Sequence, residues 1–103
     1  MSLATRISPD DRSHVSFILT GRFTFDLHRE VADAVKAVGQ EIKRVTVDLR
    51  DAEYVDSAAL GMLIQMKAKL APRDFTLKLK KDSVAHAVLA IANFDKLFAI
   101  ESV

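Results

Sequence analysis

Residues 45–63 constrain the fold of this chain more than any other stretch of its sequence. They begin with the β-branched run Val-Thr-Val, which favours a β-strand. An acidic segment over 51–56 follows, and from Ser57 onward the chain reads Ser-Ala-Ala-Leu-Gly-Met-Leu, which is typical of the start of an apolar helix. A strand that leads through a loop into a buried helix is a building unit of layered α/β proteins. We therefore expect an α/β fold in which Asp56 and Ser57 lie at the start of this helix.

Periodic patterns elsewhere predict the element order β-β-α-β-α-β-α-β. Strands are expected over 5–8, 14–20, 44–49 and 75–80, with a last short strand or turn over 96–100, and helices over 27–38, 57–70 and 83–92. Gly21 is expected to end the second strand, and Ser83 or Asp82 to cap the third helix. Because single helices separate successive strands, we predict a mixed β-sheet with helices packed against it.

Two of the predicted helices have apolar faces that should supply the core. The first helix has one such face, formed by Leu27, Val31, Ala34, Val35 and Val38. The second is apolar on more than one side, through Leu60, Met62, Leu63, Ile64 and Met66, so we expect it to be largely buried.

The composition is that of an ordinary globular protein. The chain has 103 residues, of which 50% are hydrophobic and 28% charged, and 15 basic and 14 acidic side chains give a net charge of +1. We expect a single domain over residues 1–103, because this length supports one compact core, and the balanced charge does not favour direct binding of nucleic acid. The chain has no Cys, no apolar run of the roughly 20 residues that cross a bilayer, and no signal-peptide pattern. We therefore expect a cytoplasmic protein without membrane insertion.

The residues alone leave two roles open for Ser57. One is that it caps the helix, since a Ser side chain often accepts a hydrogen bond from an N–H group of the first turn. The other is that its hydroxyl is phosphorylated, which a helix N-terminus tolerates because it is the positive end of the helix dipole. A phosphate beside Asp56, and near Asp51 and Glu53, would make the loop strongly anionic and repel an acidic partner. The two roles are not exclusive.

The motif around Ser57 and the order of the elements resemble the STAS domain, the fold of bacterial anti-sigma-factor antagonists. The likeness lies in the strand, the acidic loop, Asp56-Ser57 and the following Leu-Gly-Met-Leu, and also in the segment Asn-Phe-Asp-Lys-Leu-Phe over 93–98. By this resemblance Ser57 corresponds to the phosphoacceptor of the family and Asp56 to the acidic residue before it. Ala58 and Ala59 stand where the family often has a second Ser and a Gly. Members of the family also tend to have an acidic residue soon after the Gly that ends the second strand. Here the only such residue after Gly21 is Asp26, which either caps the first helix or faces Ser57.

The resemblance implies a protein-binding module and not an enzyme. The unmodified form would bind an anti-sigma factor that is also a serine kinase, and would thereby free a sigma factor. Phosphorylation of Ser57 would end this binding, and a phosphatase would reset it. The expected partner-binding residues are Asp56, Ser57, Ala58, Glu53 and Asp26, with no catalytic residue, no metal and no cofactor.

Two other functions stay open. STAS-like domains also occur as constitutive subunits of membrane transport ATPase assemblies without a phosphoryl switch, and Ala58-Ala59 suits a permanent interface. The other possibility is an enzyme or small-ligand binder, for example for a nucleotide, at the carboxyl ends of the strands. The sequence offers little for this last function, because His14, His28 and His86 lack metal-ligand spacing and no Gly-rich phosphate loop or G-x-S-x-G motif is present.

Overall fold

The computed structural model describes residues 2–103, in which six strands form one mixed sheet. The strands are β1 (Ser2–Ser8), β2 (Asp11–Phe23), β3 (Arg44–Asp48), β4 (Ala52–Val55), β5 (Asp74–Leu79) and β6 (Ala99–Ser102). The helices are α1 (His28–Lys36), α2 (Ser57–Leu70) and α3 (Val84–Ile91), and the short 3-10 turns η1 (Phe25–Leu27) and η2 (Phe94–Lys96) precede α1 and β6.

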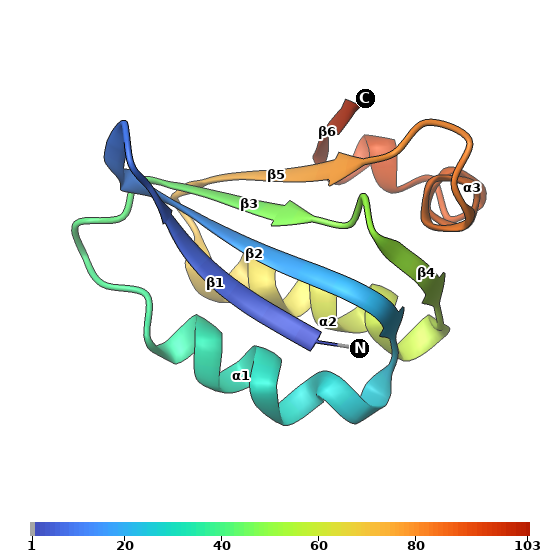
Figure 1. Cartoon of the computed structure of the whole chain (residues 1–103), viewed down its shortest axis with the longest axis horizontal. Coiled ribbons are helices and arrows are strands. Elements are labelled where there is room, and N and C mark those ends of the chain that lie inside the picture. The colour runs from blue at the N-terminus through green and yellow to red at the C-terminus, as the bar shows by residue number, and fades with distance from the viewer. Residues whose placement is uncertain (1) are drawn as a thin grey trace.

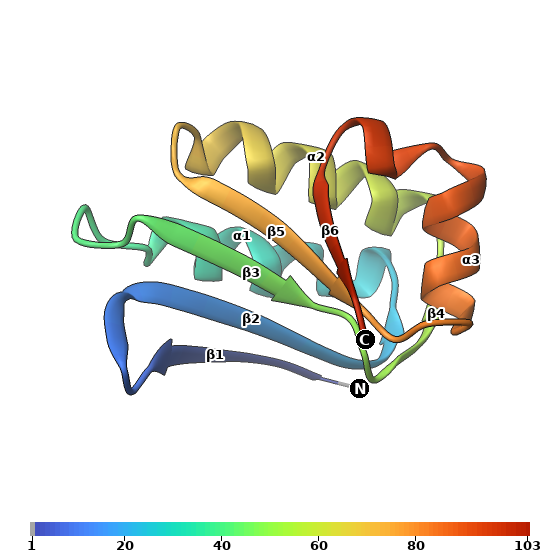
Figure 2. The same ribbon diagram turned by 90° about the horizontal axis from the view of Figure 1, so that it is seen from above.

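The sheet has the order β1-β2-β3-β5-β6, and β4 pairs with the far end of β2. Only the β1–β2 pair is antiparallel among the described strands, and the other pairs are parallel. Helices α1 and α2 lie side by side against one face of the sheet, while α3 lies at the end of the sheet beside β4 (Figures 1 and 2). This arrangement confirms the predicted α/β fold with a mixed sheet and helices packed against it. In the part of the chain that is described, no helix combines the length and the apolar character needed to span a bilayer.

Strand β4 lies where the sequence predicted only an acidic loop, and β2 runs past Gly21, where it was expected to end. Gly21 has a φ of 76°, in the region that glycine adopts without steric strain, and the strand register shifts there. Residues 14–18 of β2 pair with β3, and residues 21–23 pair with β4. The expectation of a strand end at Gly21 was wrong because the positive φ lets the strand change register and continue.

The core fills the space between the sheet and the two helices. Its fully buried side chains alternate along the central strands, as the sequence predicted, and include Phe17, Leu19, Val45, Val47, Leu77 and Leu79. Leu27, Val31 and Val35 are buried on the α1 side, and Met62, Leu63 and Met66 on the α2 side. Ile64 is 47% exposed, so the expectation that it lies in the core was wrong. The sheet occupies only one side of α2, and Ile64 lies on another side.

The third helix and the last strand follow the predicted order with small shifts. Ser83 caps α3, since its hydroxyl accepts a hydrogen bond from the His86 N–H at 3.1 Å. The last strand, expected over 96–100, begins at Ala99 because η2 occupies residues 94–96.

Arg73 joins two loops at the end of the molecule where β3 and β5 begin. Its guanidinium donates to the carbonyl oxygens of Ile42 at 2.9 Å, Gly39 at 3.1 Å and Leu70 at 3.3 Å. These bonds link the segment before β3 to the end of α2, and hydrogen bonds from a charged group are among the stronger ones in proteins.

We therefore expect Arg73→Ala to lower the free energy of unfolding by about 1–3 kcal/mol, because it removes three hydrogen bonds from a charged group that link these two segments. Urea unfolding followed by circular dichroism measures this difference. Arg12→Ala is the matched control, since Arg12 is exposed. Equal stability of the two variants would contradict a joining role for Arg73.

Candidate functional site

The N-terminus of α2 is capped by Asp56 and not by Ser57. Asp56 has an extended backbone (φ −97°, ψ 176°), and its Oδ1 accepts a hydrogen bond from the Ala59 N–H at 2.8 Å. Ser57 is the first helical residue. The expectation that Ser57 caps this helix was therefore wrong, because Asp56 already has the backbone geometry and the side chain of an N-cap.

Asp56 also joins α2 to the end of β2. Its Oδ2 accepts a hydrogen bond from the Phe25 N–H at 3.3 Å, and its own N–H donates to the Phe23 carbonyl at 3.3 Å. The start of α2 is therefore fixed against the segment that connects β2 to α1.

Ser57 is exposed, and its hydroxyl forms no hydrogen bond with any other residue of the described chain. A helix that begins at Ser57 has no internal acceptor for the N–H groups of its first residues. Asp56 satisfies the Ala59 N–H, so the N–H groups of Ser57 and Ala58 stay available to an anion at this position. The hydroxyl is thus accessible, and the surroundings accommodate negative charge.

The other predicted site residues come from three different elements. Ala58 is half-buried in the first turn of α2, and Glu53 is exposed on β4, the strand that leads into Asp56. Asp26 is exposed within η1, next to Phe25, whose N–H binds Asp56. The structure therefore brings Asp26 onto the segment that contacts the start of α2.

Asp26 does not cap the first helix, contrary to one of the two roles expected for it. The residue before α1 is Leu27, and neither Leu27 nor Thr24, which precedes η1, makes a side-chain capping bond. The 3-10 turn places Asp26 inside the turn, so it does not hold the position of a cap.

Sequence reasoning missed two exposed aromatic side chains beside this site. Phe25 is 58% exposed and stacks on the His28 ring at a centroid distance of 4.3 Å. Tyr54, on β4, lies under the guanidinium of Arg22 at 4.5 Å. The signal in the sequence for Phe25, and for Arg22 that covers Tyr54, was the aromatic and basic character of residues 22–25, directly after Gly21. Exposed aromatic residues of this kind are common anchors in protein interfaces.

Asp48 is a buried carboxylate near the carboxyl end of β3, and it forms an ion pair. Arg50 donates to it from Nη2 at 2.8 Å, from Nε at 3.0 Å and from its backbone N–H at 3.0 Å. Burial acts to raise the pKa of Asp48, but the hydrogen bonds from Arg50 outweigh burial and place that pKa below its ordinary value. Asp48 is therefore held as a paired carboxylate, which suits a structural role better than proton transfer.

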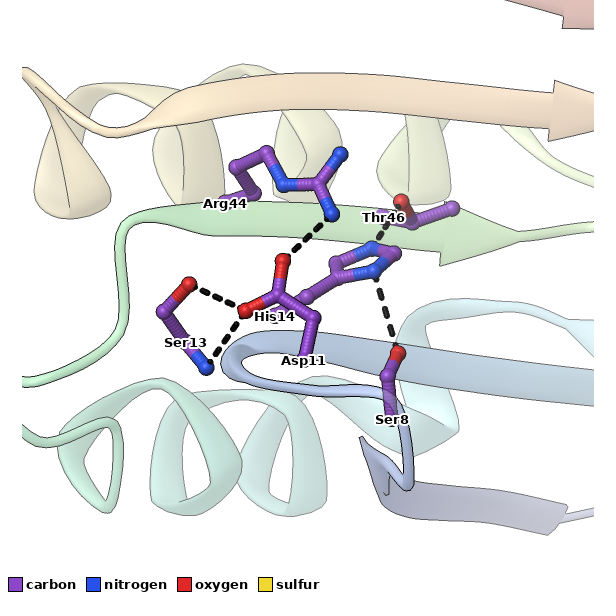
Figure 3. Close-up of polar contacts among 6 residues, drawn as sticks. All are labelled: Ser8, Asp11, Ser13, His14, Arg44 and Thr46. Carbon is purple, nitrogen blue, oxygen red and sulfur yellow. Dashed lines mark hydrogen bonds and ion pairs between the residues drawn. The ribbon is translucent and has the colours of Figure 1, made fainter.

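A second polar cluster lies at the other end of β2 (Figure 3). The His14 ring is hydrogen-bonded to the Ser8 hydroxyl at 3.0 Å and to the Thr46 hydroxyl at 2.8 Å. Beside it, hydrogen bonds from Ser13 and Arg44 hold the pKa of Asp11 at about 2. The cluster joins β1, β2 and β3 and is separated from Ser57 by the length of β2, so we assign it to the fold and not to the site.

Comparison with known proteins gives consistent results. A family model described as "Mlab, STAS domain" matches residues 8–100. A STAS-domain containing protein of Pseudomonas aeruginosa (strain UCBPP-PA14) is 35% identical over 97 residues, which cover 93% of this chain and 96% of the relative.

Solved structures share the fold at low sequence identity. The anti-sigma factor antagonist SpoIIAA in its unphosphorylated form superposes with a TM-score of 0.67 at 13% identity, covering 99% of this chain and 87% of SpoIIAA. An anti-sigma factor antagonist from Mycobacterium paratuberculosis gives a TM-score of 0.74 at 17% identity, covering 97% of this chain and 86% of that one. The fold is thus that of the anti-sigma factor antagonists.

The different roles of Asp56 and Ser57 predict different effects of their substitution. Asp56→Ala should lower the free energy of unfolding by about 1–2 kcal/mol, because it removes the cap of α2. Ser57→Ala should change it by less than about 0.5 kcal/mol, since an exposed side chain without hydrogen bonds is lost. Urea unfolding of both variants measures the difference, and equal losses would contradict capping by Asp56 alone.

The His14 cluster predicts a pH dependence of stability. Burial, followed by the positive charge of Arg44 and by the weaker effect of Lys78, lowers the pKa of His14 against the opposing charge of Asp11. The folded state therefore binds fewer protons at His14 than the unfolded state does. The contribution of His14 to the free energy of unfolding is complete above about pH 6.5 and is lost as the pH falls below that value.

Between about pH 7 and pH 5, wild type should lose more stability than His14→Gln, which cannot titrate there. Denaturant unfolding of both proteins across this range measures the two profiles. Parallel profiles would contradict a lowered pKa of His14.

Proposed function

Because the chain belongs to the STAS-domain family, we propose that it is a protein-binding module that phosphorylation of Ser57 switches off. In this proposal the unmodified chain binds an anti-sigma factor that is also a serine kinase, and a sigma factor is thereby released. The kinase transfers the γ-phosphoryl group of ATP to Ser57 Oγ, with release of ADP and the hydroxyl proton. A phosphatase later hydrolyses the phosphoester. The chain is the substrate of both steps and is itself non-enzymatic.

The observation that carries the proposal is the free hydroxyl of Ser57 at the start of α2. The side chain is exposed and Asp56 does the capping, so neither folding nor capping requires the hydroxyl. The anti-sigma factor antagonists that share this fold support the anti-sigma class of partner.

A phosphate at Ser57 should leave the fold intact. The N-terminus of a helix is the positive end of its dipole, and a negative charge there stabilises the helix by about 0.3–1 kcal/mol. The N–H groups of Ser57 and Ala58 are available to phosphate oxygens. The effect of modification would then fall on partner binding.

Electrostatic repulsion is large enough to end binding. A phosphoserine carries about −1.5 to −2 charge at pH 7. At about 6 Å from one acidic group of a partner, each unit of charge contributes roughly 2–3 kcal/mol of repulsion at an effective dielectric constant near 20. Solvent screening that halves this energy still leaves about a tenfold loss of affinity. We assign the partner contact to Asp56, Ser57 and Ala58, with Glu53 and Asp26 at its edge.

The second candidate function is a constitutive subunit of a membrane transport ATPase assembly, without a phosphoryl switch. The observation that favours it is apolar surface outside the Ser57 site: Ile64 of α2 is 47% exposed, Ile91 at the end of α3 is 83% exposed, and Leu97 after η2 is 50% exposed. Such side chains would be covered in a permanent complex.

Quantitative co-purification from the native host tests the proposal, with wild type, Ser57→Ala and Ser57→Asp as baits. We expect an anti-sigma factor with kinase activity to bind wild type and Ser57→Ala and to be lost from Ser57→Asp by at least tenfold. Incubation of the purified pair with ATP should add one phosphate to wild type and none to Ser57→Ala, as intact-mass spectrometry measures.

A complex with a membrane ATPase that all three baits and phosphorylated wild type retain equally would contradict the switch and support the second candidate. Asp is an imperfect mimic of phosphoserine because it carries less charge. The phosphorylated wild-type bait is therefore the decisive arm.

A further inference from the structure

An apolar groove with a volume of about 370 Å³ runs between α1 and α2. Val31 of α1 and Met62 and Met66 of α2, all buried, line its floor. Ala58 and Gly61 line it near the start of α2, where the exposed Phe25 also contributes. The groove therefore begins one residue after Ser57 and follows α2 towards Lys69.

Gly61 keeps part of this groove open, although no contact within the chain requires a glycine at this position. A glycine in a helix interior destabilises the helix relative to alanine. A Cβ added at Gly61 would meet no atom within 4 Å, so no neighbouring residue requires the missing side chain. The space fits the close approach of another molecule.

Positive side chains flank the groove on both sides. Lys69 lines it from α2, and on α1 Arg29 and Lys36 lie three residues before and four residues after Ala32, which also lines it, and therefore on the same side of the helix. All three cations are exposed, and none forms an ion pair within residues 2–103. The groove thus has an apolar floor and is flanked by positive side chains that form no ion pair in the described part of the chain.

We propose that this groove docks an amphipathic helix of a partner protein, whose apolar face is flanked by acidic side chains. The lining residues of α2 extend from Ala58 to Lys69, which corresponds to about 16 Å or three helical turns at 1.5 Å per residue. A groove between two packed helices matches the ridge of side chains on a third helix, and apolar grooves commonly bind helices in this way. Acidic flanks would pair with Arg29, Lys36 and Lys69.

The inference rests on the proposed function in one respect, that the chain is a protein-binding module. It adds the kind of segment that is bound and a surface outside the acidic loop. Because Ser57 directly precedes Ala58, a phosphate there would lie at one end of the groove and repel an acid-flanked helix.

Site-specific photo-crosslinking in the native host identifies the occupant. A photo-reactive residue replaces the exposed Gln65, which lines the groove, and in a control chain it replaces the exposed Ala87 of α3. We expect mass spectrometry to find, at Gln65 only, a partner segment with an apolar helical face between acidic residues. A second copy of this chain, a lipid, a segment without acidic flanks, or no adduct would overturn the inference.

Binding of that segment, made as a synthetic peptide, then tests the contacts by titration of the full chain. Gly61→Leu fills the groove and Arg29→Glu reverses a rim charge, and each should weaken binding at least tenfold. Both changes suit a helix, since Leu is a better helix former than Gly and Glu is favourable in a first turn. Ala87→Leu and Arg12→Glu are the matched controls and should leave binding unchanged.

The same titration with Ser57→Asp and with phosphorylated wild type separates the two proposals. Loss of binding with Gly61→Leu but not on phosphorylation would support the groove and contradict the switch. Loss on phosphorylation but not with Gly61→Leu would support the switch and overturn the groove.

Discussion

The carboxylate of Asp56 holds together the segments on which the candidate site depends. One oxygen caps α2 through the Ala59 N–H, the other accepts from the Phe25 N–H, and the backbone N–H donates to the Phe23 carbonyl. The end of β2, the turn before α1 and the start of α2 therefore meet at one residue. Because Asp56 takes the capping position, Ser57 has a helical backbone and a hydroxyl that the fold does not use.

Because Asp56 and not Ser57 caps α2, a phosphate on Ser57 would have opposite effects on folding and on partner binding. At the start of α2 the added charge would stabilise the helix by about 0.3–1 kcal/mol through the helix dipole. The same charge would repel an acidic partner, and this repulsion would be larger than the gain in helix stability.

Much of the fold could be predicted from periodicity, and the exceptions depend on contacts between distant residues. Sequence patterns predict the three helices and four of the other five strands, whereas the segment that forms β6 was expected as a short strand or a turn. Strand β4 was not predicted because it has only four residues, and these do not alternate strictly between apolar and polar. It pairs with the part of β2 that continues past Gly21. Gly21 looks like a strand end in the sequence because its positive φ, which permits the register shift, is visible only in the folded chain.

The site shows the same limit at the level of single side chains. Asp56 and Ser57 are both good helix caps, so composition cannot choose between them, and the extended backbone of Asp56 decides. The sequence shows Gly61 as part of a motif, but it does not show whether packing requires a glycine there. Only the structure shows that a Cβ at Gly61 would meet no atom within 4 Å. The hydroxyl of Ser57 and the opening at Gly61 lie about one turn apart on α2. If both proposals hold, a partner helix docked at Gly61 would lie close enough to Ser57 for a phosphate there to act on it directly.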